Sequence, residues 1–190
     1  MKAVIFNGAK EGDLTLEGVE KALVDQLTKA RWAVEPIELR DTQIAPCLGC
    51  FGCWIKTPGI CVIDDAGRET TRKAIQSDLQ VWLTPVTFGG YSSELKKAID
   101  RIIPILLPYF KVYQGQIHHQ MRYEKYPNLL VIGVQEAAAD HEETFVALAE
   151  RNMLNFRPPA YAFSVFPREK DPKTIPAFVE EQLRKVEVKS

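Results

Sequence analysis

The residues of this chain best suited to chemistry are its four cysteines, which all lie in one short segment. Cys47, Cys50 and Cys53 are each separated by two residues, and Cys61 follows after a turn at residues 57–59. Thiols at this spacing can converge on one centre. Structural zinc sites usually pair two separated C-x2-C units, whereas successive two-residue spacings are more common among iron–sulfur ligands. The spacing therefore favours an iron–sulfur cluster over zinc, with reduced cysteines that fill a small contact loop as an alternative of about equal weight.

A second candidate segment covers residues 84–92 and reads TPVTFGGYS. Gly89 and Gly90 permit close approach of the backbone, and Phe88 and Tyr91 provide flat apolar surface. The backbone N–H groups ahead of the following helix are free donors. Such a loop suits a planar heteroaromatic ring, and the alternative is a tight turn whose aromatic side chains pack in the core.

The third candidate is the loop NGAKEGDLT at residues 7–15. Its N–H groups and the start of the following helix could hold a phosphate. The loop matches neither the dinucleotide glycine fingerprint nor the Walker pattern. Glu11 and Asp13 would repel an anion that Lys10 and Thr15 attract, so these residues favour a phosphate site and a plain turn equally.

Five short apolar segments predict the buried strands that would position these loops. They cover residues 2–7, 33–39, 79–84, 128–134 and 161–165. Pro36 removes a ladder donor from the second segment and predicts an edge position for it. Apolar residues at helical spacing predict helices near residues 16–31, 67–76, 92–106, 145–152 and 175–186.

Strands that alternate with helices predict an α/β fold with an open, doubly wound parallel sheet and helices on both faces. One domain at residues 1–190 accounts for the chain, with a cysteine-containing loop at 45–66 and a surface excursion at 108–127. Ligands of such sheets collect beyond the carboxyl ends of the strands, where the strand order reverses. All three candidate segments follow predicted strands.

The composition narrows the classes of function. Of the 190 residues, 46% are hydrophobic and 26% are charged, which excludes a disordered chain. The net charge of −1 gives no broad electrostatic reason to bind nucleic acid. The longest apolar run, at residues 102–107, is far shorter than the ~20 residues that a membrane helix needs. With no visible secretory signal and with grouped cysteines, we expect a cytoplasmic protein with no nucleic-acid or membrane partner.

Taken together, the segments resemble the flavodoxin-like NAD(P)H-dependent FMN reductases and, within them, the iron–sulfur flavoproteins. The resemblance rests on residues 46–54 (PCLGCFGCW), 57–65 (TPGICVIDD) and 84–92, continuing through Leu95-Lys96 to Asp100-Arg101. The first loop departs from the family, which typically has Ser-Pro-Arg where this chain has Ala9-Lys10-Glu11.

The resemblance implies a flavodoxin-like five-stranded sheet in the order 2-1-3-4-5, with FMN bound at a subunit interface of a homodimer or homotetramer. It implies cofactor contacts from three loops. These are Gly8, Ala9, Lys10 and Thr15 toward the phosphate; Pro85, Val86, Thr87, Phe88, Gly89, Gly90 and Tyr91 along the ring; and Gln135 and Glu136 after the fourth strand. It also implies that the four cysteines can hold a [4Fe–4S] cluster.

The implied function is an FMN-dependent oxidoreductase that passes electrons from NAD(P)H to a small-molecule acceptor such as a quinone, or to a redox partner. The flavin would carry the chemistry, and N–H donors at residues 87–90 would stabilise negative charge on the reduced ring. No side chain is predicted to act as a catalytic acid or base. Two alternatives remain open: a non-catalytic flavodoxin-like electron carrier, and a flavin-free protein that binds another ligand or senses thiols.

Overall fold

A five-stranded parallel sheet forms the centre of the molecule in the computed structural model, which describes residues 1–136 and 141–188. The strands lie in the order β2-β1-β3-β6-β7. Their bounds are β1 (Lys2–Asn7), β2 (Ala33–Glu38), β3 (Leu79–Pro85), β6 (Asn128–Gln135) and β7 (Tyr161–Pro167). These are the five predicted strands, so the predicted order 2-1-3-4-5 and the flavodoxin-like fold class are confirmed.

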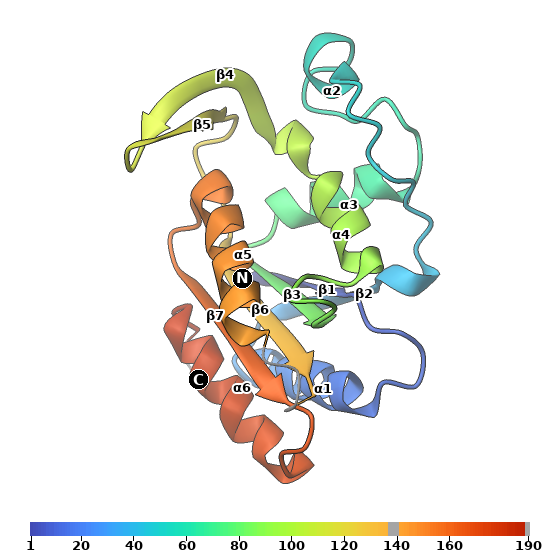
Figure 1. The fold of residues 1–190 in the computed structure, drawn as a ribbon, viewed down its shortest axis with the longest axis vertical. Helices are drawn as coiled ribbons and strands as arrows, with labels where there is room; N and C mark the ends of the chain where they lie inside the picture. Colours follow the sequence, from blue (N-terminus) through green and yellow to red (C-terminus); the bar gives the residue numbers. More distant parts are fainter. Residues whose placement is uncertain (137–140, 189–190) are drawn as a thin grey trace.

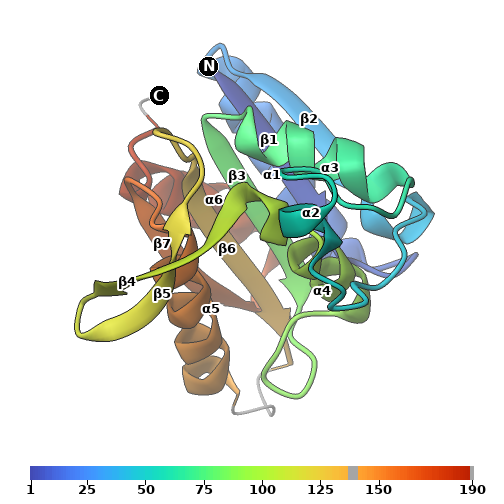
Figure 2. The same cartoon turned by 90° about the horizontal axis from the view of Figure 1, so that it is seen from above.

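Helices cover both faces of the sheet (Figures 1 and 2). One face carries α1 (Leu14–Lys29) and α6 (Ile175–Lys185), and the other carries α3 (Ala66–Ile75), α4 (Ser93–Asp100) and α5 (Glu142–Phe156). Successive side chains of a strand point to opposite faces. In β1, Ala3 and Ile5 therefore pack against α1 and α6, whereas Val4 and Phe6 pack against α4 and α5. This two-sided burial explains why apolar residues predominate in the central strands.

Strand β2 lies at the edge of the sheet, as Pro36 predicted. Pro36 pairs with Ile5 of β1, its only neighbouring strand. A proline has no N–H to donate on the open side, so the edge position costs no ladder hydrogen bond. The residues of β2 are half-buried or exposed, in contrast to the buried residues of β1.

The predicted helix at 92–106 is shorter in the structure, which corrects that prediction. Helix α4 ends at Asp100, a 3-10 turn η2 (Ile103–Ile105) follows, and Leu106 already begins a strand. Pro104 explains the end of the helix, because proline has no N–H and disfavours helical geometry in the residue before it. The apolar residues after Asp100 are still buried, but they reach the core from the turn and the strand.

A two-stranded antiparallel ribbon, β4 (Leu106–Tyr113) and β5 (Gln116–Met121), overlaps the segment 108–127 predicted as a surface excursion and begins two residues before it. Gln114 and Gly115 form its turn, both with positive φ, which suits a two-residue hairpin loop. Figure 2 shows the ribbon reaching out from the sheet beside α5. The remaining short elements are η1 (Leu39–Asp41), α2 (Gly52–Ile55) and η3 (Pro172–Thr174). Within the described ranges, every helix is too short or too polar to cross a bilayer.

Candidate functional site

The carboxyl ends of β1, β3 and β6 bring the three predicted cofactor loops together. The Gly8 N–H donates to the Leu83 carbonyl at 2.8 Å, and the Val86 N–H donates to the Val134 carbonyl at 2.8 Å. The Ser92 hydroxyl donates to the Gly8 carbonyl at 2.7 Å. A Cβ atom on Gly8 would lie 2.5 Å from the Ser92 Oγ atom, so only glycine permits this approach.

The loop after β3 closes as a tight turn. Thr87 and Gly90 exchange two backbone hydrogen bonds of 2.9 Å each, and Phe88 and Gly89 between them have φ values of 50° and 76°. The amides of Thr87 and Gly90 are thus already engaged, although they were predicted to serve a cofactor. Among the described residues, the amides of Phe88 and Gly89 have no acceptor, and the Phe88 side chain is 94% exposed. Donors and flat apolar surface are therefore concentrated at the tip of the turn.

Tyr91 faces the core instead of the surface of this loop. Its ring makes edge contacts with Trp82 and Phe145, and its hydroxyl accepts a hydrogen bond from the Asn152 Nδ2 atom at 3.0 Å. Burial raises the pKa of Tyr91 to about 12, against a smaller lowering effect of Asn152. The side chain therefore braces the turn from behind, as the core-packing alternative for the loop anticipated.

Gln135 and Glu136 lie at the end of β6, next to the loop after β3. The Oε1 atom of Gln135 is buried and accepts no hydrogen bond from the described residues. Glu136 forms an ion pair of 3.0 Å with Arg168, which follows β7. Pro85 and Val86 are half-buried at the adjoining end of β3. An unused acceptor and unused donors therefore occur on neighbouring loops at this edge of the sheet.

The start of α1 already holds a carboxylate. Asp13 caps the helix by accepting from the Leu16 N–H at 3.2 Å, and Arg168 donates to both its oxygens at 2.6 and 2.8 Å. Burial raises the pKa of Asp13, but the hydrogen bonds from Arg168 and Leu16 outweigh it and the pKa falls below its ordinary value. The position predicted for a phosphate is therefore taken by a negative side chain of the chain itself.

The other residues predicted for the phosphate have different surroundings. Ala9 is buried, and its N–H donates to the Asn7 Oδ1 atom at 2.8 Å. Lys10 is exposed and Thr15 is half-buried. Gly8, Ala9 and Lys10 also border a hollow of about 520 Å³ that includes Arg40 and Ser92.

The four cysteines line one small enclosed hollow of about 20 Å³, together with Arg101. None of them forms a disulfide; Cys53 is buried, Cys61 is half-buried, and Cys47 and Cys50 are exposed. Burial raises the pKa of the Cys53 thiol, and the charge of Cys61 adds to the effect. The four cysteines therefore border one space, and their role as ligands of a shared centre stays a prediction.

The spacing of these thiols does not suit a single ion. No group of three or more His, Cys, Asp or Glu side chains in the described ranges can hold one metal ion. Thiolates around a tetrahedral zinc ion must lie roughly 3.8 Å apart, because each Zn–S bond is about 2.3 Å long. In an iron–sulfur cluster each thiolate binds a different iron. Four cysteines around one hollow are a donor set of that kind.

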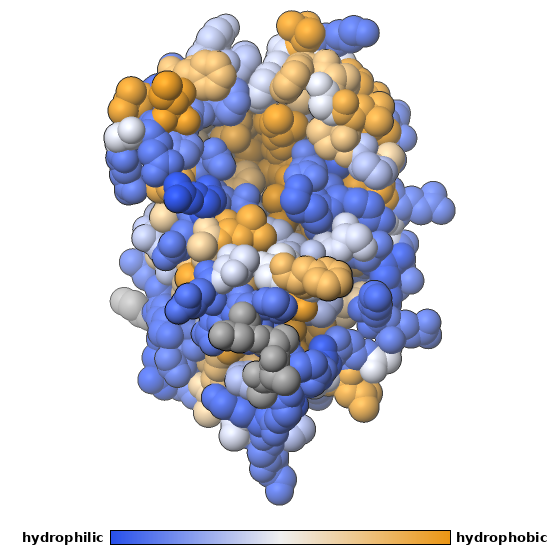
Figure 3. Space-filling view, in the orientation of Figure 1, coloured by the Kyte–Doolittle hydropathy of each residue, from blue (hydrophilic) through white to orange (hydrophobic). Residues whose placement is uncertain are grey.

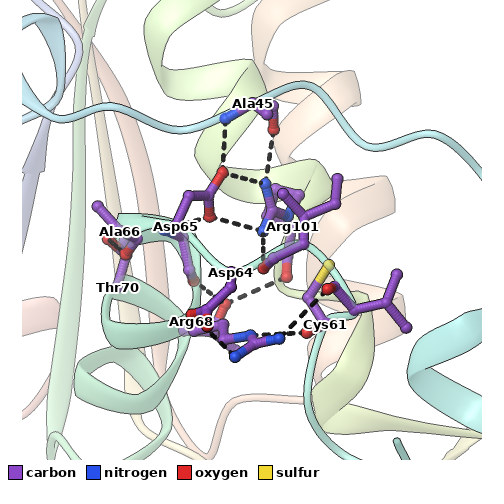
Figure 4. A network of polar contacts seen from close by, with 12 residues as sticks. Ala45, Cys61, Asp64, Asp65, Ala66, Arg68, Thr70 and Arg101 are labelled. Atoms are coloured by element: carbon purple, nitrogen blue, oxygen red, sulfur yellow. Dashed lines mark hydrogen bonds and ion pairs between the residues drawn. The ribbon is translucent and has the colours of Figure 1, made fainter. Parts of the chain in front are cut away.

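Both ends of the cysteine segment are fastened to the end of α4 (Figure 4). The guanidinium of Arg101 binds both oxygens of Asp65 at 2.8 Å and donates to the Ala45 carbonyl at 2.7 Å and the Ile63 carbonyl at 3.3 Å. The Arg101 hydrogen bonds lower the pKa of Asp65 to about 2. Gly67 leaves room for this pair, since a Cβ atom there would lie 2.9 Å from an Asp65 oxygen.

A second arginine holds the backbone next to the last cysteine. The Nε atom of Arg68 donates to the Cys61 carbonyl at 2.8 Å, and its Nη2 atom donates to the Val62 carbonyl at 3.2 Å. An ion pair of 2.8 Å with Asp64 completes its contacts (Figure 4). The sequence marked Arg101 only as part of a motif, and it gave no signal for Arg68.

A large pocket of about 710 Å³ adjoins the cysteine hollow. Cys61 lines both of them. The apolar part of the pocket wall consists of Ile60, Ile75, Pro104, Ile105 and Tyr123. Charged side chains line the rest of it: Asp64, Asp65, Arg68, Glu69, Arg72 and Lys125.

Exposed apolar side chains gather on the ribbon and on the cysteine segment. They are Tyr109, Phe110, Val112 and Ile117 on the ribbon, and Leu48, Phe51, Ile55 and Ile60 on the segment. Figure 3 shows hydrophobic surface on both sides of a hollow between these two parts. Trp54 connects them, because its Nε1 atom donates to the Leu106 carbonyl at 3.0 Å and its ring contacts that of His119.

Comparison with known proteins gives one family and several relatives. A family model described as NADPH-dependent FMN reductase matches residues 1–167. An iron–sulfur flavoprotein of Methanocaldococcus jannaschii is 33% identical over 107 residues, which cover 55% of this chain and 53% of that protein. An iron–sulfur flavoprotein of Archaeoglobus fulgidus is 29% identical over 104 residues, which cover 55% of this chain and 46% of that protein. The chain thus spans about half the length of the curated relatives it matches.

Solved structures share the fold at low identity. An NAD(P)H:quinone oxidoreductase from Methanothermobacter marburgensis superposes with a TM-score of 0.67 at 15% identity, covering 97% of this chain and 96% of that one. An FMN-dependent NADH-azoreductase from Bacillus anthracis, in complex with FMN, gives a TM-score of 0.67 at 14% identity, covering 96% of each chain. At these identities the likeness establishes the fold alone.

Proposed function

Because the chain belongs to the NADPH-dependent FMN reductase family, as its sequence segments predicted, we propose that it is an FMN-dependent oxidoreductase that takes electrons from NAD(P)H. The observation that carries this proposal is the meeting, at the carboxyl edge of the sheet, of donors and an acceptor that have no partner among residues 1–136 and 141–188. The amides of Phe88 and Gly89 and the buried Oε1 atom of Gln135 lie on neighbouring loops there. A planar ring with both acceptor and donor edges complements this set.

On the ring side, the residues present fit a flavin. The Phe88 and Gly89 amides would donate to it, and the exposed Phe88 ring would cover part of its face. Pro85, Val86, Thr87, Gly90, Gln135 and Glu136 would border it, and Tyr91 would support the turn from the core. A bound flavin supplies hydride and single-electron transfer, and the protein positions and tunes it.

On the phosphate side, the fit requires a rearrangement. Asp13 occupies the start of α1 and holds Arg168. If the Asp13 side chain turns away, Arg168 becomes a cation for the phosphate, next to Gly8, Ala9, Lys10 and Thr15. Arg168 would then compensate for the missing arginine of the family pattern in the first loop.

The four cysteines would hold a [4Fe–4S] cluster, which supplies one-electron transfer. Support comes from the shared hollow and from the donor set, and two of the relatives are named iron–sulfur flavoproteins. The chain's own contribution is to hold the segment in place through the contacts of Arg101 and Arg68. Unpaired, reduced cysteines also fit a cytoplasmic location.

The pocket beside Cys61 is the proposed site of the electron acceptor. Its volume of about 710 Å³ is in the range of small-molecule sites. Its apolar wall, with the Tyr123 ring, suits a flat organic acceptor such as a quinone. Because Cys61 lines both the hollow and the pocket, an acceptor bound there would lie next to a cluster ligand.

We also propose that the protein is a homo-oligomer. The apolar side chains exposed on the ribbon and the cysteine segment form a surface that a single chain leaves in water. Contiguous apolar patches of this kind mark interaction sites. A second copy of the chain would cover them.

The proposed activity is tested by anaerobic oxidation of NADPH by FMN-loaded protein in the presence of menadione. We expect turnover, and titration with FMN should quench the flavin fluorescence. Reduction by dithionite but not by NADPH or NADH would identify an electron carrier instead. Protein that stays colourless after FMN titration would contradict both functions.

Two glycines with the same backbone geometry provide a matched pair of variants. Gly89 has φ 76° at the tip of the proposed flavin turn, and Gly115 has φ 75° in the ribbon turn. A Cβ atom on Gly89 would lie 2.8 Å from Thr144, whereas Gly115 has open space. Gly89→Ala should weaken FMN binding, and Gly115→Ala should leave it unchanged.

A further inference from the structure

We propose that Arg101 donates a hydrogen bond from its Nε atom to the cluster held by the four cysteines, either at the Cys61 sulfur or at an adjacent sulfide. The inference rests on the proposed function, because it requires the cluster. It adds to that function a residue that would set the redox properties of the cluster.

The first observation is an unused donor. The Arg101 side chain is 1% exposed, and its Nε atom is buried without a hydrogen-bond partner among the described residues. The N–H groups of the two Nη atoms all donate hydrogen bonds, to Asp65, Ala45 and Ile63. Native proteins rarely bury an N–H group without an acceptor, and such groups call for an explanation such as an absent ligand.

The second observation is the position of this donor. Arg101 lines the same hollow as the four cysteines. Cys61 lines it too, so the guanidinium and the Cys61 side chain border one small space. A sulfur-rich ligand that fills the hollow would supply the acceptor that Nε lacks.

The third observation is that the contacts to Asp65 do not explain why the Nε atom is buried without an acceptor among the described residues. A residue needed only for the ion pair and the two carbonyls would use its terminal nitrogens, as Arg101 does. The fixed plane of the guanidinium directs Nε to another side of the group. The ion pair holds that plane still, so Nε keeps one orientation on a side chain that lines the hollow.

The chemical consequence concerns the charge of the cluster. Hydrogen bonds to the sulfurs are one of the factors that set the potential of an iron–sulfur cluster. Reduction adds negative charge, which a donor and a nearby guanidinium stabilise. Arg101 would therefore raise the reduction potential and favour transfer of electrons onto the cluster.

Pulsed EPR of the reduced cluster in protein labelled with [15N]arginine tests the proposal directly. We expect a nitrogen hyperfine coupling in the wild type that Arg101→Lys removes, because lysine keeps a positive charge but has no Nε–H in that position. Arg101→Lys should also shift the midpoint potential to a more negative value. Arg68→Lys is the matched control, because Arg68 contacts the Cys61 carbonyl but does not line the hollow. In that variant the coupling should persist.

The outcomes separate this inference from the proposed function. Iron and acid-labile sulfide are measured first; their absence in anaerobically prepared wild type would refute the cluster itself. A wild-type cluster without any arginine coupling would overturn only the role of Arg101, even if Arg101→Lys does not fold. Loss of the coupling in Arg68→Lys would identify Arg68 as the donor, and this result would also overturn the role of Arg101.

Discussion

Arg101 and Asp65 form a two-armed ion pair in which both N···O distances are 2.8 Å and the arginine is almost completely buried. The pair joins the last turn of α4 to the end of the cysteine segment. At the other end of the same helix, Ser92 caps α4 and donates to the Gly8 carbonyl. One short helix thus connects the proposed cluster site with the proposed flavin site.

Removal of the Asp65 charge should destabilise the fold. Asp65→Asn leaves a buried guanidinium without its counter-ion, which costs about 3 kcal/mol. Urea denaturation measures this loss. The control is Glu69→Gln, because Glu69 pairs with Arg72 on the exposed side of α3 and its loss should change stability by less than ~0.5 kcal/mol. Equal effects of the two variants would contradict the importance of the buried pair. The Asp65 contribution should also disappear as the pH falls from about 3.8 toward 2, because its folded pKa is lowered to about 2.

Glu20 should make the protein less stable as the pH rises from about 4.5 to about 7. Burial, and to a smaller extent the nearby Glu38, raise its pKa to about 7 against the opposing hydrogen bond from Asn7. The folded state therefore binds more protons than the unfolded state between about pH 4.5 and pH 7, so stability falls across that window. Since the site is half-buried and partly screened, the expected loss is about 1 kcal/mol.

Denaturation of Glu20→Gln at several pH values between about 5 and 8 checks this dependence. The variant should be the more stable protein at the alkaline end of that range, because an amide does not ionise. Glu17→Gln, on the exposed side of the same helix, should keep the wild-type profile. A wild-type profile in Glu20→Gln would contradict the assignment.

Asp13 should limit the affinity for the phosphate of FMN. Asp13→Asn keeps a good helix cap, removes a negative charge and releases Arg168. The dissociation constant for FMN should fall about threefold to tenfold, the equivalent of ~0.7–1.4 kcal/mol. Titration with FMN and with riboflavin separates the contribution of the phosphate from that of the ring. Riboflavin has no phosphate, so its dissociation constant should not change. Asp25→Asn, an exposed change farther along α1, is the control and should leave the affinity for FMN unchanged. An equal gain for both flavins would refute a phosphate effect.

The acceptor pocket should respond to a reversed charge at its border. Lys125 is exposed and lines the pocket. Lys125→Glu should raise the KM for a sulfonated naphthoquinone about threefold to tenfold, corresponding to roughly 1 kcal/mol, and leave that for menadione unchanged. Lys29→Glu, an exposed change on α1, should affect neither. If Lys125→Glu leaves the KM values for the two quinones in the same ratio as in the wild type, the acceptor binds elsewhere.

The ribbon should control assembly. Val112 and Ile117 face each other across β4 and β5 and are 71% and 73% exposed. Val112→Glu would place a charge in a buried apolar contact if a second copy covers the ribbon, so the assembly should dissociate. Sedimentation velocity measures the change. Lys111→Glu, on the opposite face of the same strand, is the control. A monomeric wild type would contradict the homo-oligomer.

The sheet was predictable from the sequence because burial on both faces demands unbroken apolar runs. Pro36 even marked the edge strand correctly. The end of α4 was not predictable, since the apolar spacing continues past Asp100 while Pro104 stops the helix. The ribbon has no hydrophobic alternation strong enough to distinguish it from a loop, apart from the Gln114-Gly115 turn.

The candidate site was predictable in its loops but not in its side-chain contacts. The four cysteines line one hollow, and the cluster that their spacing predicts stays a prediction. The pairing of Asp13 with Arg168 joins residues 155 positions apart, and no local pattern reports such a contact. The inward direction of Tyr91 depends on Trp82 and Phe145, which reach it from other elements.

The way the cysteine segment is fastened bears on how the protein would survive damage by oxygen. Its two ends are held by Arg101, and between them Trp54 and Arg68 make the contacts described above, but the segment contributes no strand to the sheet. If the proposed cluster is lost, we expect residues 46–62 to loosen while the rest of the fold stays intact. Repair would then require only new iron and sulfide, and the polypeptide would not have to be made again.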